Sequence, residues 1–231
     1  NTLGFQSHRD RFAVAFSQEE LEQRLQEFRN TKYSDAEIKS KYNLKDNRDW
    51  SLAAARQKIQ GEENWKKSII QFFYRPFDLR FCYFSTIAMD CPRTIFQQHL
   101  AQDNLALNVV RQTKSSDWGH ALMANTPTPA LYVELKDGSN AFPLYLYPDT
   151  QNQQGNLFTE KKPNFSESFL KTIRQKLGYT PTPEAIFYYI YAIFHSPTYR
   201  QRYAEFLKID FPRVPLTANN KLFKALGTKG E

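Results

Sequence analysis

The sequence predicts an α+β protein with a helical N-terminal lead-in, a central and mostly antiparallel β-rich region, and C-terminal helices packed on it. Three observations predict this order. Helix-capping signatures concentrate before residue 65 and after residue 165, and aromatic and β-branched residues concentrate between residues 71 and 148. Helices and strands therefore come in blocks, which favours an α+β fold over a doubly wound sheet.

Size and composition exclude several classes of protein. The chain has 231 residues, of which 41% are apolar and 24% charged, a balance typical of globular domains and unlike disordered, collagen-like or coiled-coil chains. Its longest apolar run, residues 185–194, is about half of what a membrane span requires. Cys82 and Cys91 lack the paired spacing of a zinc site. We therefore expect a cytoplasmic protein with no membrane partner.

Basic residues outnumber acidic ones, and the excess is uneven along the chain. Lys and Arg total 31 against 24 Asp and Glu, which gives a net charge of +7. Residues 151–231 alone carry 12 basic and 6 acidic side chains. Such an excess favours a polyanionic partner, because basic side chains that neutralise phosphates release condensed counterions.

The first 65 residues are expected to be mostly helical. Residues 12–16 indicate a short strand, and Ser17 with Glu20 then forms a capping box that opens a helix through about residue 28. Ser34 with Glu37 repeats this signature. An Ala-rich third helix is expected over residues 49–59, stopped by Gly61, and a short fourth one over residues 62–70.

The centre, residues 71–148, is expected to be β-rich. Short aromatic and β-branched runs, each bounded by Pro, Gly, Asn or Asp, occur at residues 71–84, 105–112, 120–125, 130–138 and 140–148. One helix is expected near residues 94–100, and the pair Asp137-Gly138 is a hairpin-turn signal. Residues 149–164 are polar and without periodicity, which predicts a flexible loop.

Helices return over residues 165–226. Ser166 caps the first of them, which ends at Gly178, and Thr182 followed by Pro183 opens the second. Ser196-Pro197 opens a third over residues 198–208. Apolar residues at helical spacing predict a core-facing stripe on each of the last two helices: Ile186, Tyr189, Ile190 and Ile193 on one, and Tyr199, Tyr203, Phe206 and Leu207 on the other.

One pattern raises the alternative of a metal-dependent nuclease. Asp117, followed by Glu134 and Lys136 two residues apart, has the acid, acid-x-lysine order of such sites, in which carboxylates hold the ion and lysine steadies the phosphate. The competing interpretation is a hairpin strand whose polar face carries Glu134 and Lys136. The sequence contains no glycine-rich phosphate loop, and its histidines lack metal-ligand spacing. We therefore expect no cofactor in this chain.

The segment Tyr74–Arg80 contains two arginines and an aspartate close to aromatic residues. Asp78 can pair with a guanidinium, and the rings can stack on one, so a buried structural ion pair at the head of the sheet is one interpretation. Contact of Arg75 and Arg80 with phosphates or bases is the other.

Polar residues at the ends of expected strands and helices are better candidates for base contacts than Arg75 and Arg80. Arg and Gln pair bidentately with guanine and adenine edges, so Arg93, Arg111 and Gln112 are candidates. The loop around Trp118 either stacks that ring on a base or buries it over a core edge. The remaining candidate DNA contacts lie in this loop and on the last long helical segment: Lys114, Ser115, Trp118, His120 and Arg200.

Four motifs resemble the C-terminal specificity region of type ISP restriction-modification enzymes and related N6-adenine DNA methyltransferases. They are Arg9-Asp10-Arg11-Phe12, Tyr74-Arg75-Pro76-Phe77-Asp78 with Arg80, Phe142-Pro143-Leu144-Tyr145-Leu146-Tyr147-Pro148, and the long block from His195-Ser196-Pro197-Thr198-Tyr199-Arg200 through Pro215-Leu216. The resemblance covers essentially the whole chain.

This resemblance implies a division of labour. An upstream methyltransferase domain would bind S-adenosylmethionine and the flipped adenine, and this chain, which lacks the Asn-Pro-Pro-Tyr type motif, would recognise the sequence of double-stranded DNA. Residues 1–65 would be the lead-in that follows the missing domain, and residues 66–231 the target-recognition domain. A structural coupling domain that does not bind DNA is a further alternative. No methylation residue is carried over to this chain.

Overall fold

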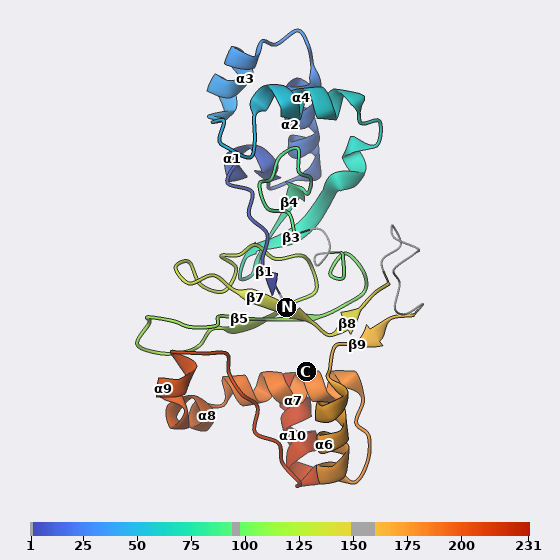
Figure 1. Cartoon of the computed structure of the whole chain (residues 1–231), viewed down its shortest axis with the longest axis vertical. Helices are drawn as coiled ribbons and strands as arrows, with labels where there is room; N and C mark the ends of the chain where they lie inside the picture. The colour runs from blue at the N-terminus through green and yellow to red at the C-terminus, as the bar shows by residue number, and fades with distance from the viewer. Residues whose placement is uncertain (1, 94–97, 149–159) are drawn as a thin grey trace.

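The computed structural model describes residues 2–93, 98–148 and 160–231. Its elements stack in three layers along the long axis of the molecule (Figure 1). Helices α2–α4 form one end, a four-stranded sheet lies in the middle, and helices α6–α10 form the other end. The predicted α+β class with C-terminal helices is confirmed.

Short elements capped by serine build the N-terminal layer. Ser17, Ser34 and Ser51 each accept a backbone N–H from the first turn of the helix that follows, which satisfies donors that have no partner within the helix. The elements of this layer are α1 (Asp10–Ala13), β2 (Val14–Ala15), α2 (Gln18–Arg29), α3 (Asp35–Tyr42) and α4 (Leu52–Gly61). The strand expected over residues 12–16 is thus shorter, because residues 10–13 form a helical turn.

A hairpin joins this layer to the rest of the chain. Strands β3 (Ile69–Arg75) and β4 (Asp78–Tyr83) pair antiparallel, and β2 adds to the free side of β4. The helix expected over residues 62–70 is reduced to a 3₁₀ turn, Trp65–Ser68, because Ile69 and Ile70 pair with β4 instead. Phe12, Leu21 and Phe28 share one core with Tyr83 of β4, so residues on both sides of position 65 pack together.

The central sheet has the strand order β1-β7-β5-β6, and all of its pairings are antiparallel. Its strands are β1 (Thr2–Leu3), β5 (Ala106–Val109), β6 (Ala121–Ala124) and β7 (Asn140–Pro143). The N-terminal segment therefore reaches past the first layer and closes one edge of a sheet built from residues more than 100 positions away. This placement fixes the first layer on the second.

Residues 130–138 do not form the expected strand. They run as successive turns, and the Glu134 carboxylate accepts the backbone N–H groups of Lys136 and Asp137 at 2.6 and 2.7 Å. A side chain that bonds its own following amides competes with a strand ladder, which is the physical reason for the difference. Gly138 has the positive φ of a turn, +67, but no strand directly precedes it, so the hairpin expected at Asp137-Gly138 is wrong.

Strand β9 (Lys162–Pro163) pairs antiparallel with β8 (Tyr145–Leu146), so the last residues of the segment expected to be a flexible loop are strand. Residues 149–159 of that segment lie outside the described residues, as do residues 94–97 of the helix expected near residues 94–100. The loop is therefore tested only over residues 160–164, which include this strand, and the helix only over residues 98–100, which form a turn.

The C-terminal layer is helical, and three of its helices begin directly after the cap residues that the sequence predicted. Ser166, Thr182 and Ser196 each accept an N–H of the following helix, and Gly178 has the positive φ of a helix end. The helices are α6 (Glu167–Leu177), α7 (Pro183–His195), α8 (Pro197–Arg202), α9 (Ala204–Leu207) and α10 (Asn220–Gly230). Helix α7 lies beneath the sheet, and Phe187 and Phe194 share a core with Leu107 and Val109 of β5.

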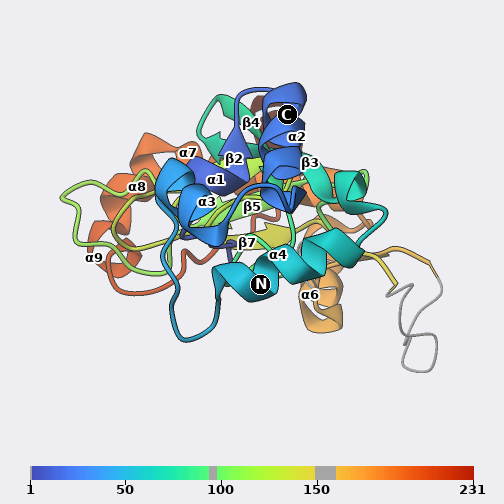
Figure 2. The same cartoon turned by 90° about the horizontal axis from the view of Figure 1, so that it is seen from above.

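One predicted core residue is on the surface. Phe206 is 69% exposed, whereas Tyr199 and Leu207 of the same stripe are buried. The stripe assumed one helix over residues 198–208, but the helix ends at Arg202, and Tyr203 leaves the helical conformation at φ −111 and ψ 18 before α9 starts. The break rotates the face of α9 and turns Phe206 outward. Figure 2 shows α8 and α9 on the opposite side of the molecule from α6.

Candidate nucleic-acid interface

The segment between β5 and β6, residues 110–120, is termed the 110–120 loop. It is held at both ends by backbone hydrogen bonds, from Val110 to His120 O at 3.4 Å and from Thr113 to Lys208 O at 3.0 Å. The second bond fixes the loop against the end of α9. Most of the predicted DNA contacts lie in this loop: Arg111, Gln112, Lys114, Ser115, Trp118 and His120.

Three of these side chains are exposed to solvent. Gln112 and Lys114 are exposed, and Arg111 is 67% exposed, with its Nε 3.3 Å from the Asp210 carboxylate. The pKa of Asp210 is lowered first by the backbone N–H of Phe211 and then by Arg111. An exposed ion pair of this kind contributes little to stability, so the Arg111 guanidinium can exchange this partner for a phosphate or a base edge at small cost.

Trp118 points into the protein. It is 5% exposed and packs edge-to-face against Phe194 at 5.8 Å, within the core between the sheet and α7. Its Nε1 is buried and has no hydrogen-bond partner among the described residues. In this conformation the ring covers a core edge, the second of the two roles that the sequence left open, and contact with a base would require the loop to move.

His120 and Ser115 are partly buried. Burial lowers the pKa of His120, whose ring meets that of Trp118 edge-to-face at 6.5 Å. The backbone N–H of Ser115 donates to Thr113 Oγ1 at 3.1 Å. Their contacts shape the loop, and their direct contact with DNA stays a prediction.

Arg200 anchors the 110–120 loop from below. Its Nε donates to the Phe194 carbonyl at 2.6 Å, at the end of α7, and its Nη2 lies 3.1 Å from His195 Nδ1. A guanidinium only donates, so Nδ1 accepts and the His195 proton is on Nε2, which donates to Ala121 O at 3.0 Å. Burial lowers the pKa of His195, which favours this neutral form. The chain Arg200–His195–Ala121 therefore fixes the start of β6.

Arg75 and Arg80 lie on the β3–β4 hairpin rather than at the loop. Arg80 donates to both carboxylate oxygens of Asp78 at 2.7–3.1 Å, and these hydrogen bonds lower the pKa of Asp78. Arg75 donates to the Tyr74 carbonyl at 2.6 Å. The expected ion pair is present but is not buried, since the side chains of Arg80 and Asp78 are 23% and 31% exposed. Contact of either arginine with DNA stays a prediction.

Arg93 is separate from both groups. It is exposed and has φ +55, two residues after the bridge that pairs Gln6 with Cys91. The structure thus brings together the predicted residues of the 110–120 loop with Arg200, and it places Arg75, Arg80 and Arg93 elsewhere.

The residues of the nuclease alternative do not form a metal site. Glu134 is engaged by the amides of its own turn, and Asp117 is exposed in the 110–120 loop. Residues 2–93, 98–148 and 160–231 contain no group of three or more His, Cys, Asp or Glu side chains that could hold a metal ion. The expected hairpin strand carrying Glu134 and Lys136 is also wrong, because these residues lie in a turn.

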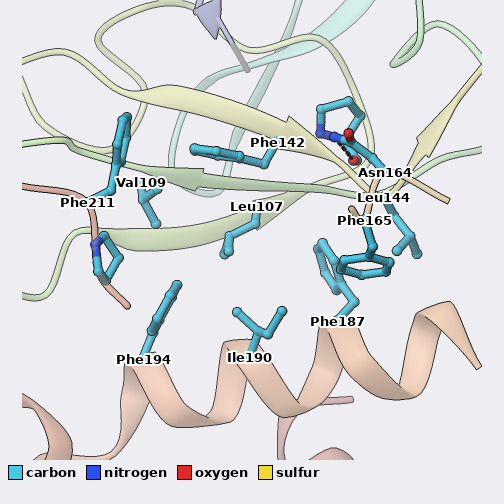
Figure 3. Close-up of a pocket in the computed structure, with 12 residues that line it drawn as sticks. Leu107, Val109, Phe142, Leu144, Asn164, Phe165, Phe187, Ile190, Phe194 and Phe211 are labelled. Carbon is cyan, nitrogen blue, oxygen red and sulfur yellow. Dashed lines mark hydrogen bonds between the residues drawn. The ribbon is translucent and has the colours of Figure 1, made fainter. Parts of the chain in front are cut away.

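An apolar pocket of about 280 Å³ lies between the central sheet and α7 (Figure 3). Leu107 and Phe142 line it from the sheet and Ile190 and Phe194 from the helix, and no described residue that lines it is charged. Its only drawn hydrogen bond joins the Asn164 amide to Pro143 O at 2.9 Å. Such a lining does not match a phosphate or a nucleotide, so the exposed loops are the candidate interface.

Sequence reasoning missed two long-range partners of the loop and of the strand that follows it. Asp210 pairs with Arg111 across 99 positions, and His195 meets Ala121 across 74 positions. Neither contact can be predicted from a local sequence pattern, because its two residues are far apart in the chain.

Fold and site together define a small α+β binding domain, whose polar and cationic side chains are carried by a loop at one edge of a sheet. The profile of the Type ISP C-terminal specificity domain matches residues 1–231. The chain therefore belongs to this family. A comparison with curated proteins found no match.

Three solved structures share the fold. A cryo-EM structure of a DrdV–DNA complex is 24% identical with a TM-score of 0.74, covering 99% of this chain and 22% of that one. The ATP-dependent Type ISP restriction-modification enzyme LlaBIII bound to DNA is 22% identical with a TM-score of 0.70, covering 99% and 15%. A nuclease-deletion mutant of the Type ISP enzyme LlaGI with a DNA substrate mimic is 22% identical with a TM-score of 0.63, covering 98% and 21%.

The chain spans about a fifth or less of the length of these enzymes. No helix in the described part of the chain is both long and apolar enough to span a membrane.

Proposed function

We propose that this chain is the part of an N6-adenine DNA methyltransferase of the type ISP kind that recognises the target sequence in double-stranded DNA. The observation that carries the proposal is the 110–120 loop. It presents Arg111, Gln112 and Lys114 to solvent while backbone bonds and the Arg200–His195 pair hold its ends. The DNA complexes of the enzymes that share the fold support this choice of ligand.

In this proposal, recognition divides between two kinds of contact. Lys114 and other exposed basic side chains bind phosphates and set the register of the protein on the duplex. Arg111 and Gln112 read base edges, because their side chains match guanine and adenine in the major groove. The domain thereby places the target adenine for extrusion into a catalytic domain outside this chain.

S-adenosylmethionine belongs to that catalytic domain, where it supplies the methyl group. We assign no residue of this chain to it. We place the protein in the cytoplasm, since Cys82 and Cys91 are both free thiols, as is usual in a reducing compartment.

The test uses the natural full-length polypeptide that carries this chain. Arg111→Ala and Lys114→Ala, alone and combined, are compared with Lys176→Ala, an exposed lysine on α6 at the other side of the molecule. Affinity is measured from about 50 to 200 mM salt on the duplex that the wild-type protein selects from a random pool. Loss of the Lys114 phosphate contact reduces the magnitude of the slope of log affinity against log salt by about 1, and loss of the Arg111 base contact weakens binding by about 1–3 kcal/mol.

The expected result is a lower slope for the double variant and an unchanged one for Lys176→Ala. Wild-type affinity and slope in the double variant would overturn the assignment of the loop. A protein lacking residues 66–231 that still binds the selected duplex as tightly as the wild type would overturn the proposed function and leave only a structural coupling role.

A further inference from the structure

The tip of the β3–β4 hairpin presents an aromatic ring to solvent. Arg75 pairs with Asp78, so Pro76 and Phe77 alone make the turn. Phe77 is 94% exposed and has φ +64, a conformation in which glycine or asparagine is ordinary and a bulky residue is rare. Both the exposure of the ring and the backbone conformation are unfavourable in the protein alone.

The base of the tip holds two guanidiniums. The Arg75 and Arg80 guanidiniums each stack on the Tyr74 ring at 4.2 Å, and the Tyr74 hydroxyl lies 3.0 Å from the Asp10 carboxylate. Asp78 is paired with Arg80, while Arg75 has no carboxylate partner among the described residues. The carboxylates of Asp10 and Asp78 balance the two guanidiniums in number, and Arg75 is the guanidinium behind the phenyl ring that forms no ion pair with either of them.

The β3–β4 hairpin and the 110–120 loop of the candidate interface lie next to the same segment, residues 129–137. The ring of Phe73 on β3 contacts the ring of Tyr132, with the centroids 6.1 Å apart. The same segment contains Asp137, whose carboxylate accepts the Lys114 backbone N–H at 3.4 Å. The hairpin and the 110–120 loop are therefore both joined to residues 129–137.

We propose that Phe77 is a wedge that inserts between adjacent base pairs of the bound duplex, an inference that rests on the proposed function. Apolar side chains at DNA interfaces enter the stack in this way and unstack one base step. The Arg75 guanidinium, which has no carboxylate partner among the described residues, lies at the base of the same turn and can bind a phosphate beside that step, which favours DNA over an apolar protein surface as the occupant. The fixed turn keeps the ring projecting, so little side-chain or backbone ordering accompanies insertion.

The experiment compares Phe77→Ala, Phe77→Gly and the control Leu222→Ala in the full-length protein. Leu222 is an exposed apolar residue on α10. Affinity for the duplex selected from a random pool and the permanganate reactivity of its thymines, which reports unstacking, are both measured. Both Phe77 variants should bind about 5- to 100-fold more weakly and lose one reactive step. The glycine variant should do so although it relaxes the turn, and Leu222→Ala should behave as wild type.

Wild-type affinity and an unchanged thymine pattern in both Phe77 variants would overturn the wedge. So would a change in hydrogen exchange elsewhere in the polypeptide without DNA, because it would show that Phe77 contacts protein. If the wedge alone is wrong, Arg111→Ala and Lys114→Ala still weaken binding and lower its salt dependence. If the proposed function is wrong, those variants also behave as wild type.

Discussion

Replacing Arg200 with alanine should loosen the 110–120 loop without removing any residue of that loop. The substitution removes the donors to Phe194 O at 2.6 Å and His195 Nδ1 at 3.1 Å. It also removes the guanidinium 5.8 Å from the Trp118 ring centroid. A hydrogen bond from a charged group contributes about 1.5–3 kcal/mol, and water can take over part of this at a half-buried site. We therefore expect a net loss of about 2 kcal/mol.

Hydrogen exchange in the full-length protein measures this loss where it occurs. A change of about 2 kcal/mol in the local opening free energy speeds exchange about 30-fold, and the amide of Val110, which bonds His120 O, is a direct reporter. Arg200→Lys should recover only part of the protection, because an ammonium lacks the planar fork. Lys176→Ala is the matched control.

The result separates two roles for Arg200. Faster exchange at the loop in the absence of DNA supports the anchor. Unchanged protection together with weaker DNA binding would refute it and show that Arg200 contacts DNA directly.

Two further substitutions test other parts of the account. In the folded protein the pKa of His195 is lowered by burial, so its stabilising contribution is full above the unfolded pKa of about 6.5 and is lost as the pH falls through the folded pKa. His195→Gln keeps an acceptor for Arg200 and a donor for Ala121 O and should make loop exchange less dependent on pH; an identical pH profile would contradict this. Gly4→Ala should destabilise the sheet by about 1–3 kcal/mol, because a Cβ there overlaps the Pro129 backbone, whereas Gly61→Ala meets no atom within 4 Å and should be near neutral in urea denaturation.

Local features of the fold could be predicted from the sequence. Ser17, Ser34, Ser166 and Thr182 each cap the helix expected after them, because capping depends on side chains within three residues. The turn at residues 130–138 and the break at Tyr203 were missed. In the first, a Glu134 side-chain bond replaces a strand ladder; in the second, tertiary packing interrupts a helix that its periodicity favours.

The sequence identified the residues of the candidate site, but it did not predict how they are positioned in space. The polar run of Arg111, Gln112 and Lys114 is visible in the sequence, but its fixation depends on His195 and Lys208, which are distant in the chain. For Trp118 the sequence allowed a surface and a core role equally, because burial of one ring depends on the position of α7 beneath the sheet. Contacts between residues far apart in the chain therefore determine both how the loop is held and whether Trp118 is buried.

The central claim is that this chain selects the DNA sequence on which a separate catalytic domain acts. Sequencing the adenines methylated in a random-sequence library by the full-length protein and by its Arg111→Ala, Gln112→Ala and Lys114→Ala variants tests it most directly. We predict relaxed discrimination at particular bases for Arg111→Ala or Gln112→Ala, and uniformly weaker methylation for Lys114→Ala. An identical consensus with undiminished methylation in all three variants would contradict the account.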